Sequence, residues 1–377
     1  MFSLKVMNHL VSQTRYLTSA SRKQVLRMCS TNTQDEVIFQ VKNNVGLVTL
    51  NRPKALNALN LQMANQIYPK LKEWESSVKF VIIEGTGGKA FCAGGDIRSI
   101  TSQPKGSAHQ AEFFYNEYKL NHLIGTLKIP YVALIDGITM GGGVGLSVHA
   151  PYRVATSKTL FAMPETAIGL VPDVGGSHFL PKLDGELGTY LALTGHRLKG
   201  SDCLHAGIAT HACNDVEAVK NELLNGAKDK EDIEKILNKH MEEFDEQSFA
   251  LEEKLPLIDD CFKEDSVENI LENLKRVNDE WSIKTAQTME KMSPTSMKVS
   301  LRMLREGRNK SLEECLKMEY RLVRRCCEDN DFYEGVRALL VDKDNNPKWE
   351  PKDLENVDQA MLDRYFSPLP ADQELKL

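Results

Sequence analysis

The stretch MGGGVGL at residues 140–146 decides the fold of this chain. It follows an apolar, strand-like run at residues 131–135 and precedes a segment that we expect to be helical. Glycines at such a junction let the backbone approach a ligand closely, and the first N–H groups of a helix point outward. A second glycine turn, FCAGGDI at residues 91–97, follows another apolar strand. Two such turns can direct two N–H donors at one oxygen, which is the geometry of an oxyanion hole.

Short strands and helices alternate around these turns, which predicts an α/β core at residues 35–213. Residues 214–377 are more charged and helix-like, which predicts a helical extension and C-terminal region. Within the core, glycines at strand ends mark the places where ligands usually bind. We expect strands at residues 37–41, 45–50, 80–84, 131–135, 152–155 and 160–162, and helices at residues 59–77, 112–124 and 185–194.

The composition excludes several classes of protein. No apolar run approaches the length of a membrane-spanning helix, so we expect no membrane insertion. The net charge of −6 opposes a nucleic-acid-binding surface. The eight cysteines show no metal-ligand spacing, which predicts no metal site, and in a chain without a secretory signal we expect reduced thiols. The motifs of a serine nucleophile and of a phosphate-binding loop are also absent from the sequence.

The first 34 residues differ from the rest of the chain, because they contain five basic residues and no acidic one. Serine and threonine are frequent there, and apolar residues can form one face. This pattern is typical of an organelle transit peptide, whereas a secretory signal needs a continuous apolar core. Residues 1–34 therefore predict a mitochondrial protein. The alternative is an N-terminal tail without a targeting function.

Three acidic residues are candidates for chemistry. Glu165 lies in an otherwise apolar passage, where burial would raise the pKa of its carboxyl and suit it to act as base or nucleophile. Asp173 follows eight residues later in a glycine-bearing loop that can return it to the same pocket. Glu117 falls on the apolar side of the helix expected at residues 112–124. The alternative for Glu165 and Asp173 is that each caps a helix, a common role for acidic residues.

Three motifs, in order and at family spacing, resemble the crotonase (enoyl-CoA hydratase/isomerase) superfamily. They are LNRPKALNAL at residues 50–59, KAFCAGGDI at residues 89–97 and GITMGGG at residues 137–143. The resemblance implies a crotonase-like spiral of ββα units in the core, and a coenzyme A thioester as substrate with no further cofactor. It also implies that the backbone N–H groups of Gly95 and Gly142 form the oxyanion hole.

The residue three positions after Gly142 decides which activity the resemblance implies. The superfamily's hydratases carry a glutamate there, whereas this chain has Gly145, which has no side chain to activate water. The second hydratase glutamate matches Glu165. One remaining carboxylate beside an oxyanion hole suits thioester cleavage better than reversible hydration. Four further stretches resemble a group of CoA-thioester hydrolases that act in mitochondrial valine breakdown. They are MPETAIGL at residues 163–170, PDVGG at 172–176, KMSPTS at 291–296 and FYEGVRA at 332–338.

This second resemblance implies a role for each site residue. Glu165 is implied to act as nucleophile or general base, and both versions stay open. Asp173 and Glu117 are implied to orient the substrate and water in a pocket that Gly142 also lines. The substrate is implied to be a small-molecule acyl-CoA in the mitochondrial matrix. The residues expected to border the CoA are Lys54, Ala55, Leu56, Ala93, Asp96 and Ile97.

Two other functions remain open at this stage. One is an enoyl-CoA hydratase or isomerase of the same fold, which Gly145 disfavours. The other is a non-catalytic relative that binds acyl-CoA or RNA, and the acidic net charge opposes the RNA version. The sequence does not determine self-association or the point at which the targeting segment is removed.

Overall fold

The computed structural model describes residues 35–377 except residues 243 and 245, so the predicted transit peptide lies outside the described residues. The strands of the described part form two sheets. The larger sheet has the order β1-β2-β3-β5-β7-β10 and the smaller sheet the order β4-β6-β8-β9. The strands are β1 (Val37–Lys42), β2 (Val45–Leu50), β3 (Val81–Gly85), β4 (Ala90–Cys92), β5 (Tyr131–Ile135), β6 (Ile138–Met140), β7 (Tyr152–Ala155), β8 (Leu160–Ala162), β9 (Leu198–Lys199) and β10 (His211–Ala212).

Each turn of the chain adds one strand to each sheet. β3, β5 and β7 are parallel neighbours in the larger sheet, and β4, β6 and β8 are parallel neighbours in the smaller one. Helical segments follow the strand pairs β3–β4, β5–β6 and β7–β8, so the chain advances as a spiral. The prediction of an α/β fold built as a spiral of ββα units is confirmed.

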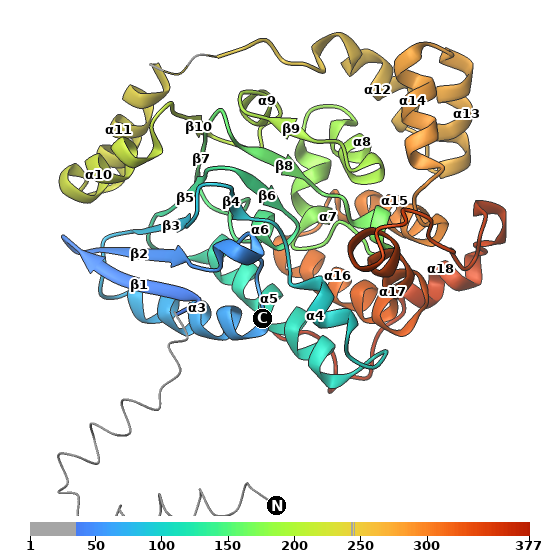
Figure 1. The fold of residues 1–377 in the computed structure, drawn as a ribbon, viewed down its shortest axis with the longest axis horizontal. Helices are drawn as coiled ribbons and strands as arrows, with labels where there is room; N and C mark the ends of the chain where they lie inside the picture. The colour runs from blue at the N-terminus through green and yellow to red at the C-terminus, as the bar shows by residue number, and fades with distance from the viewer. Residues whose placement is uncertain (1–34, 243, 245) are drawn as a thin grey trace, which may run out of the picture. The chain divides into compact units, whose positions relative to one another are not determined.

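The central strands are buried on both faces, which explains why their sequences are apolar without interruption. Ile82 and Leu134 belong to a cluster with residues of α10 (Val216–Gly226) and α11 (Lys230–Glu242). Ile83 packs instead in the main cluster with residues of α3 (Leu61–Trp74) and α5 (Ala108–Thr126). Successive side chains of a strand point to opposite faces, so helices cover the sheet on both sides (Figure 1).

The helices of the core agree with the expected ones in place but differ in length. α5 begins earlier than expected because Ser107 and Gln110 form a capping box at its start. The helix after the glycine triplet, α6, spans only Gly142–Gly145. The remaining helical segments of the core are η2 (Pro53–Ala55), α4 (Ile97–Thr101), η3 (Glu165–Ile168), α7 (Gly176–Phe179), η4 (Leu180–Lys182), α8 (Leu187–Thr194) and α9 (Asp202–His205).

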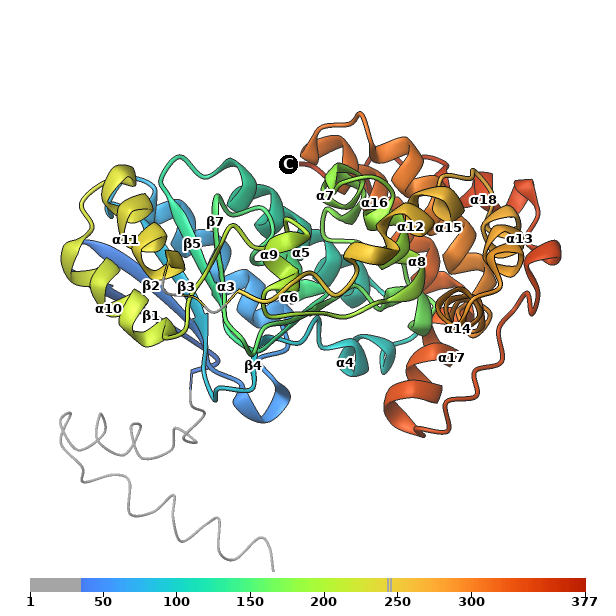
Figure 2. The same cartoon turned by 90° about the horizontal axis from the view of Figure 1, so that it is seen from above.

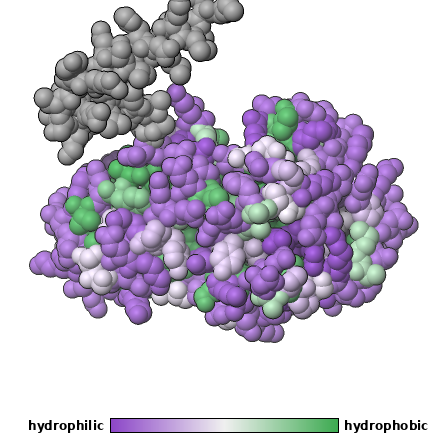
Figure 3. Space-filling view, turned by 90° about the horizontal axis from the view of Figure 1, so that it is seen from below, coloured by the Kyte–Doolittle hydropathy of each residue, from purple (hydrophilic) through white to green (hydrophobic). Residues whose placement is uncertain are grey.

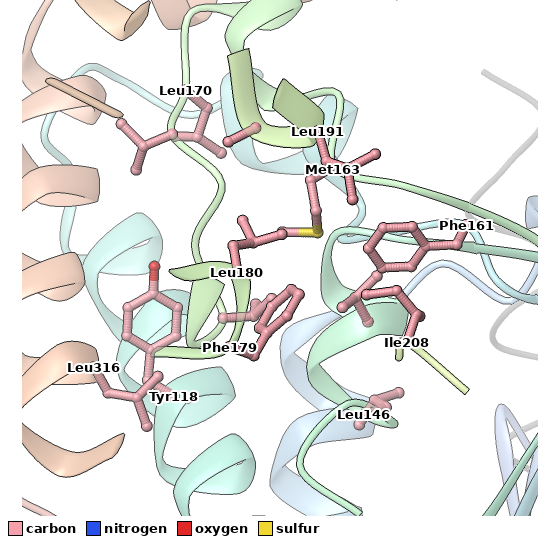
Figure 4. Packing of buried hydrophobic residues seen from close by; sticks show 14 of the residues in the cluster. Tyr118, Leu146, Phe161, Met163, Leu170, Phe179, Leu180, Leu191, Ile208 and Leu316 are labelled. Carbon is pink, nitrogen blue, oxygen red and sulfur yellow. The ribbon is translucent and has the colours of Figure 1, made fainter. Parts of the chain in front are cut away.

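The C-terminal part of the chain from residue 252 onward is helical, as predicted, and gathers at one end of the sheets, away from α10 and α11 (Figures 1 and 2). Its residues share one hydrophobic cluster with the core, and Figure 4 shows Leu316 of this part in the same packed region as Tyr118 of α5. The segments are η5 (Glu252–Lys254), α12 (Leu255–Phe262), α13 (Val267–Val277), α14 (Glu280–Met289), α15 (Pro294–Gly307), α16 (Leu312–Glu328), α17 (Asp331–Val336), η6 (Arg337–Val341), η7 (Leu354–Asn356) and α18 (Gln359–Phe366).

This shared core makes Glu36–Leu377 one compact unit. The boundary between residues 213 and 214 lies inside that unit and stays a prediction. One face of the surface is mostly hydrophilic, with hydrophobic residues in small scattered groups (Figure 3). Among the described helices, none is both long and apolar enough to cross a membrane.

Candidate active site

Two glycine turns meet at one edge of the smaller sheet. β4 and β6 are parallel neighbours, so the turns that follow them lie side by side. A Cβ atom on Gly142 would stand 3.2 Å from the backbone nitrogen of Gly95. The fold therefore brings together the two residues predicted to form the oxyanion hole.

The backbone N–H groups of these two glycines lie outside the neighbouring hydrogen-bond ladders. Next to Gly95, the carbonyl of Gly94 accepts one bond of 2.8 Å and the N–H of Asp96 donates another of 2.8 Å, so the ladder skips Gly95 itself. Gly142 is the first residue of α6, where N–H groups have no acceptor inside the helix. Gly94 and Gly141 have φ of 120° and 45°, which only glycine adopts at low cost. Two donors can thus be directed at one oxygen.

Three buried acids line the same pocket as these turns. Glu117 of α5, Glu165 at the start of η3 and Asp173 in the loop before α7 are 2%, 5% and 4% exposed. Oε1 of Glu117 lies 2.6 Å from where a Cβ on Gly142 would be, and Oε1 of Glu165 lies 2.9 Å from where a Cβ on Gly141 would be. Within residues 35–377 as described, Oε1 of Glu117 and Oε2 of Glu165 have no hydrogen-bond partner. Both carboxylates can therefore contact a ligand held at the turns.

The acids and the turns line one pocket of about 670 Å³, a size that suits a small-molecule ligand. The structure brings every predicted site residue to this pocket, whereas the role of each one stays a prediction. The predicted residues in its lining are Lys54, Ala55, Leu56, Ala93, Gly95, Asp96, Ile97, Glu117, Gly142, Glu165 and Asp173.

Burial raises the pKa of all three acids. For Glu117, burial is the main cause, and the charges of Asp173 and Glu165 raise the pKa further, well above its ordinary value. Burial and then the charge of Asp173 have the same effect on the pKa of Glu165. The pKa of Asp173 is raised to about 6 by burial, although the hydrogen bond from Tyr118 opposes this shift. Acids that repel one another ionise in turn, so a carboxylate and a protonated carboxyl can coexist in the pocket.

Helix capping does not explain Glu165 or Asp173. The N-cap residue of η3 is Pro164, and no side-chain hydrogen bond caps that helix. The N-cap residue of α7 is Gly175, again without a side-chain cap. The capping alternative is therefore wrong for both acids.

Gly145 has no room for a side chain. A Cβ atom there would lie 2.7 Å from Nδ2 of Asn121 and 2.8 Å from Cβ of Val174, distances that packed atoms do not tolerate. Asn121 is fully buried on α5, one turn after Glu117. The space that a second hydratase-type glutamate would need is thus filled by side chains from two other segments.

The residues expected to border the CoA differ in how the protein already uses them. The carboxylate of Asp96 accepts a hydrogen bond of 2.9 Å from Arg52, which also pairs with Glu36 at 3.0 Å. It also caps α4 through a 3.4 Å bond from the N–H of Ser99. The N–H and carbonyl of Asp96 are bonded within the protein as well, at 2.8 and 3.1 Å, so its backbone and side chain are both already used.

The pocket also contains residues that the sequence did not predict. Arg98, Arg197, Leu339 and Leu340 also line the pocket, and Nη2 of Arg98 donates a hydrogen bond to the carbonyl of Leu340. Arg98 and Leu340 are 242 positions apart in the chain, so no local pattern could have linked them. The C-terminal part therefore supplies some of the wall of the pocket.

The site offers little support for a thiol nucleophile or for a bound metal ion. Burial raises the pKa of the Cys92 thiol to about 12, which suits a structural thiol better than a nucleophile. Its Sγ donates to the carbonyl of Gly94 at 3.5 Å. In the described part of the chain, no group of three or more His, Cys, Asp or Glu residues is arranged to hold a metal ion. The absence of a cofactor stays a prediction.

The fold and the site together describe an α/β protein with a glycine-lined pocket that holds three buried acids. Comparison with known proteins gives its family. The model of the enoyl-CoA hydratase/isomerase family matches residues 45–366, and the chain belongs to this family.

Known relatives are similar to the chain over nearly its whole length. It is 52% identical to mitochondrial 3-hydroxyisobutyryl-CoA hydrolase of Homo sapiens, covering 91% of this chain and 92% of that protein. The protein of the same name from Danio rerio is 50% identical, covering 93% of this chain and 94% of the relative.

Solved structures show the same fold. A carnitinyl-CoA dehydratase from Mycobacterium thermoresistibile is 35% identical with a TM-score of 0.84, covering 91% of this chain and 99% of that chain. An enoyl-CoA hydratase from Rhodobacter sphaeroides 2.4.1 is 32% identical with a TM-score of 0.82, covering 91% of this chain and 100% of that chain.

Proposed function

We propose that this protein hydrolyses the thioester of 3-hydroxyisobutyryl-CoA to 3-hydroxyisobutyrate and free CoA, a step in valine catabolism. The observation that carries the proposal is the identity of 50–52% with hydrolases of that name over more than nine-tenths of the chain. Gly145 supports it independently, because the chain lacks the second carboxylate that hydration of an enoyl-CoA would use.

The thioester carbonyl oxygen would accept hydrogen bonds from the N–H groups of Gly95 and Gly142. As the carbonyl carbon becomes tetrahedral, its oxygen gains negative charge, and the two donors stabilise that charge. One such donor typically contributes about 3–4 kcal/mol to the transition state. The adjacency of the two glycines supports this role.

Glu165 would act in one of two ways. In the first, its carboxylate attacks the carbonyl carbon, the C–S bond breaks, and CoA leaves as a thiolate that takes up a proton. Water then opens the resulting mixed anhydride and restores the carboxylate. In the second, Glu165 removes a proton from a water molecule that attacks the carbonyl carbon directly; the C–S bond then breaks, and the departing CoA thiolate takes up the proton from Glu165. The unpaired Oε2 of Glu165 supports both versions equally.

Glu117 and Asp173 would select the substrate through its 3-hydroxyl group and position water. Oε1 of Glu117 is buried without a partner in the described part of the chain, so a hydroxyl group placed there gains a hydrogen bond. An acyl group without the hydroxyl would leave this oxygen unpaired and buried, which is costly. Acyl groups lacking the hydroxyl are therefore rejected.

The remaining parts of the proposal concern CoA and location. The CoA would lie along the pocket wall near residues 54–56, 93, 96 and 97, contacting mainly backbone atoms, with no cofactor besides the substrate. We propose the mitochondrial matrix as the location, because the relatives are named mitochondrial and residues 1–34 have the composition of a transit peptide. We expect no nucleic-acid partner, because the acidic net charge opposes one, and measurement of the oligomeric state would test self-association.

Release of free thiol from 3-hydroxyisobutyryl-CoA by the purified protein tests the proposal directly. We expect turnover by the wild type and its loss in Glu165→Gln, because both versions need an ionised carboxylate. Glu186→Gln is the control, since Glu186 pairs with Arg305 and Arg308 and does not line the pocket. A Glu165→Gln variant that is nearly as active as the wild type would contradict the assignment.

Two further measurements separate the alternatives. Single-turnover hydrolysis in water enriched in heavy oxygen places label in Glu165 if a mixed anhydride forms and water opens it at the Glu165 carbonyl, whereas direct attack of water on the thioester labels only the product acid. Incubation with an enoyl-CoA distinguishes a hydratase, because enoyl absorbance would then disappear without thiol release. That outcome, with no thiol released from the hydroxyacyl substrate, would replace the hydrolase proposal.

A further inference from the structure

The loop that carries Asp173 is held in a conformation that its sequence does not favour. Val174 has φ of 53°, a region that β-branched residues rarely adopt, and Gly175 follows with φ of 88°. Strained backbone of this kind persists only where the surroundings hold it in place. The question is therefore which groups hold the segment 173–177.

One holding group is His149, which lies beneath the loop. Its Nε2 is 2.7 Å from the carbonyl of Val174, and burial lowers the pKa of the imidazole to about 4, so the neutral ring donates this bond. The ring also explains the glycine at position 175, because a Cβ atom there would lie 2.5 Å from Nε2 of His149. His149 fixes the backbone on one side of Asp173.

The stronger hold comes from Glu319, on α16 of the C-terminal part. Its Oε2 accepts the N–H of Gly175 at 2.7 Å, and its Oε1 accepts the N–H and the hydroxyl of Ser177 at 2.8 and 2.5 Å. Glu319 is fully buried, and burial raises the pKa of its carboxyl to about 8 although these three donors oppose the shift. A buried carboxylate is costly, so its use against backbone N–H groups indicates a geometric role.

The loop then aims Asp173 at α5. The hydroxyl of Tyr118 donates a hydrogen bond of 2.6 Å to Oδ2 of Asp173, and Tyr118 follows Glu117 directly in the helix. Tyr118 also packs edge-to-face against Tyr320, the residue after Glu319. Glu319 of the C-terminal part and Tyr118 of the core thus bind the two ends of the loop.

We propose that Glu319 is a positioning residue for the reaction: by binding Gly175 and Ser177 it sets the place of the Asp173 carboxylate beside Glu117 and Glu165. The C-terminal helices then contribute to catalysis through this loop. The inference rests on the proposed thioester hydrolysis. It extends that proposal, because Glu319 does not line the pocket and would act only through the loop.

Glu319→Gln tests the inference while keeping the size of the side chain. A glutamine replaces one carboxylate oxygen with an NH₂ group, which cannot accept the hydrogen bond from the loop that this oxygen accepted. The loop therefore loses part of its hydrogen bonding to α16. We expect kcat to fall about 10- to 100-fold, the range that a shift of about 1 Å in a catalytic group produces. KM should change less than about threefold, because the residues expected to border the CoA belong to other segments. Glu186→Gln, which also weakens a contact between the core and the C-terminal helices, should leave kcat unchanged.

A double-mutant cycle distinguishes positioning from a general loss of structure. If Glu319 acts through Asp173, adding Glu319→Gln to Asp173→Asn should not lower the residual kcat further. An equal loss of kcat in both backgrounds, or a Glu319→Gln variant as active as the wild type, would overturn the inference.

Ser177→Ala is a second test for the case in which Glu319→Gln does not fold, because it removes only one hydroxyl donor. It should show a smaller loss that likewise vanishes in Asp173→Asn. If the wild type itself releases no thiol, the proposed function fails first.

Discussion

Replacing Gly142 with alanine would place a methyl group in the proposed oxyanion hole. The new Cβ atom would lie 3.2 Å from the nitrogen of Gly95 and 2.6 Å from Oε1 of Glu117. An oxygen that accepts from the Gly95 N–H must itself lie about 2.9 Å from that nitrogen, so the methyl group competes for this space. It also pushes Glu117 out of its place.

The size of the effect follows from the role of a single donor. Removal of one oxyanion-hole donor typically lowers kcat by about 10²–10³, or about 3–4 kcal/mol. Stability should change far less, because Gly142 does not have a left-handed φ and alanine favours helices by about 1 kcal/mol over glycine. The contact with Glu117 involves the end of a side chain that can shift. We therefore expect a folded protein with a kcat lowered by about 10²–10³.

The assay is thiol release at saturating substrate, accompanied by thermal unfolding of the same samples. Gly226→Ala is the control, because a Cβ atom there would meet only Cδ1 of Ile236 at 3.7 Å, an ordinary contact far from the pocket lining. This control should keep kcat and should not lower Tm. A Gly142→Ala variant with kcat within about tenfold of the wild type would refute the oxyanion-hole geometry.

Two further predictions concern the acids and Gly145. Burial raises the pKa of Glu165 well above the ordinary 4.5, and both versions of the reaction need this group ionised. kcat/KM should therefore fall as the pH drops through the raised pKa; a rate that stays constant down to pH 4.5 would contradict the requirement. Gly145→Glu should not create hydration of enoyl-CoA, because Asn121 and Val174 fill the space, and overpacking should cost about 1–3 kcal/mol in thermal unfolding. Enoyl-CoA consumption as fast as thiol release in this variant would show that the space can open.

The candidate site could be predicted from sequence where its residues belong to short motifs. The two glycine turns are visible because tight turns at strand ends need glycine, and Glu165 stands out as a charge in an apolar passage. Tyr118, Glu319 and the contact between Arg98 and Leu340 carry no such mark. Their partners lie far away in the chain, and only packing brings them together.

By itself the sequence determined the α/β order, the longer strands and the two glycine turns, because these depend on local spacing and on the conformational range of glycine, whereas short strands such as β6, β9 and β10 were not predicted. Only the tertiary structure decided that Glu117, Glu165 and Asp173 share one pocket, with pKa values raised by their common burial. It also decided that Gly145 has no room for a side chain and that Glu319 holds the Asp173 loop. Burial and electrostatic repulsion depend on distances in space, and the chain sets those distances only when it is folded.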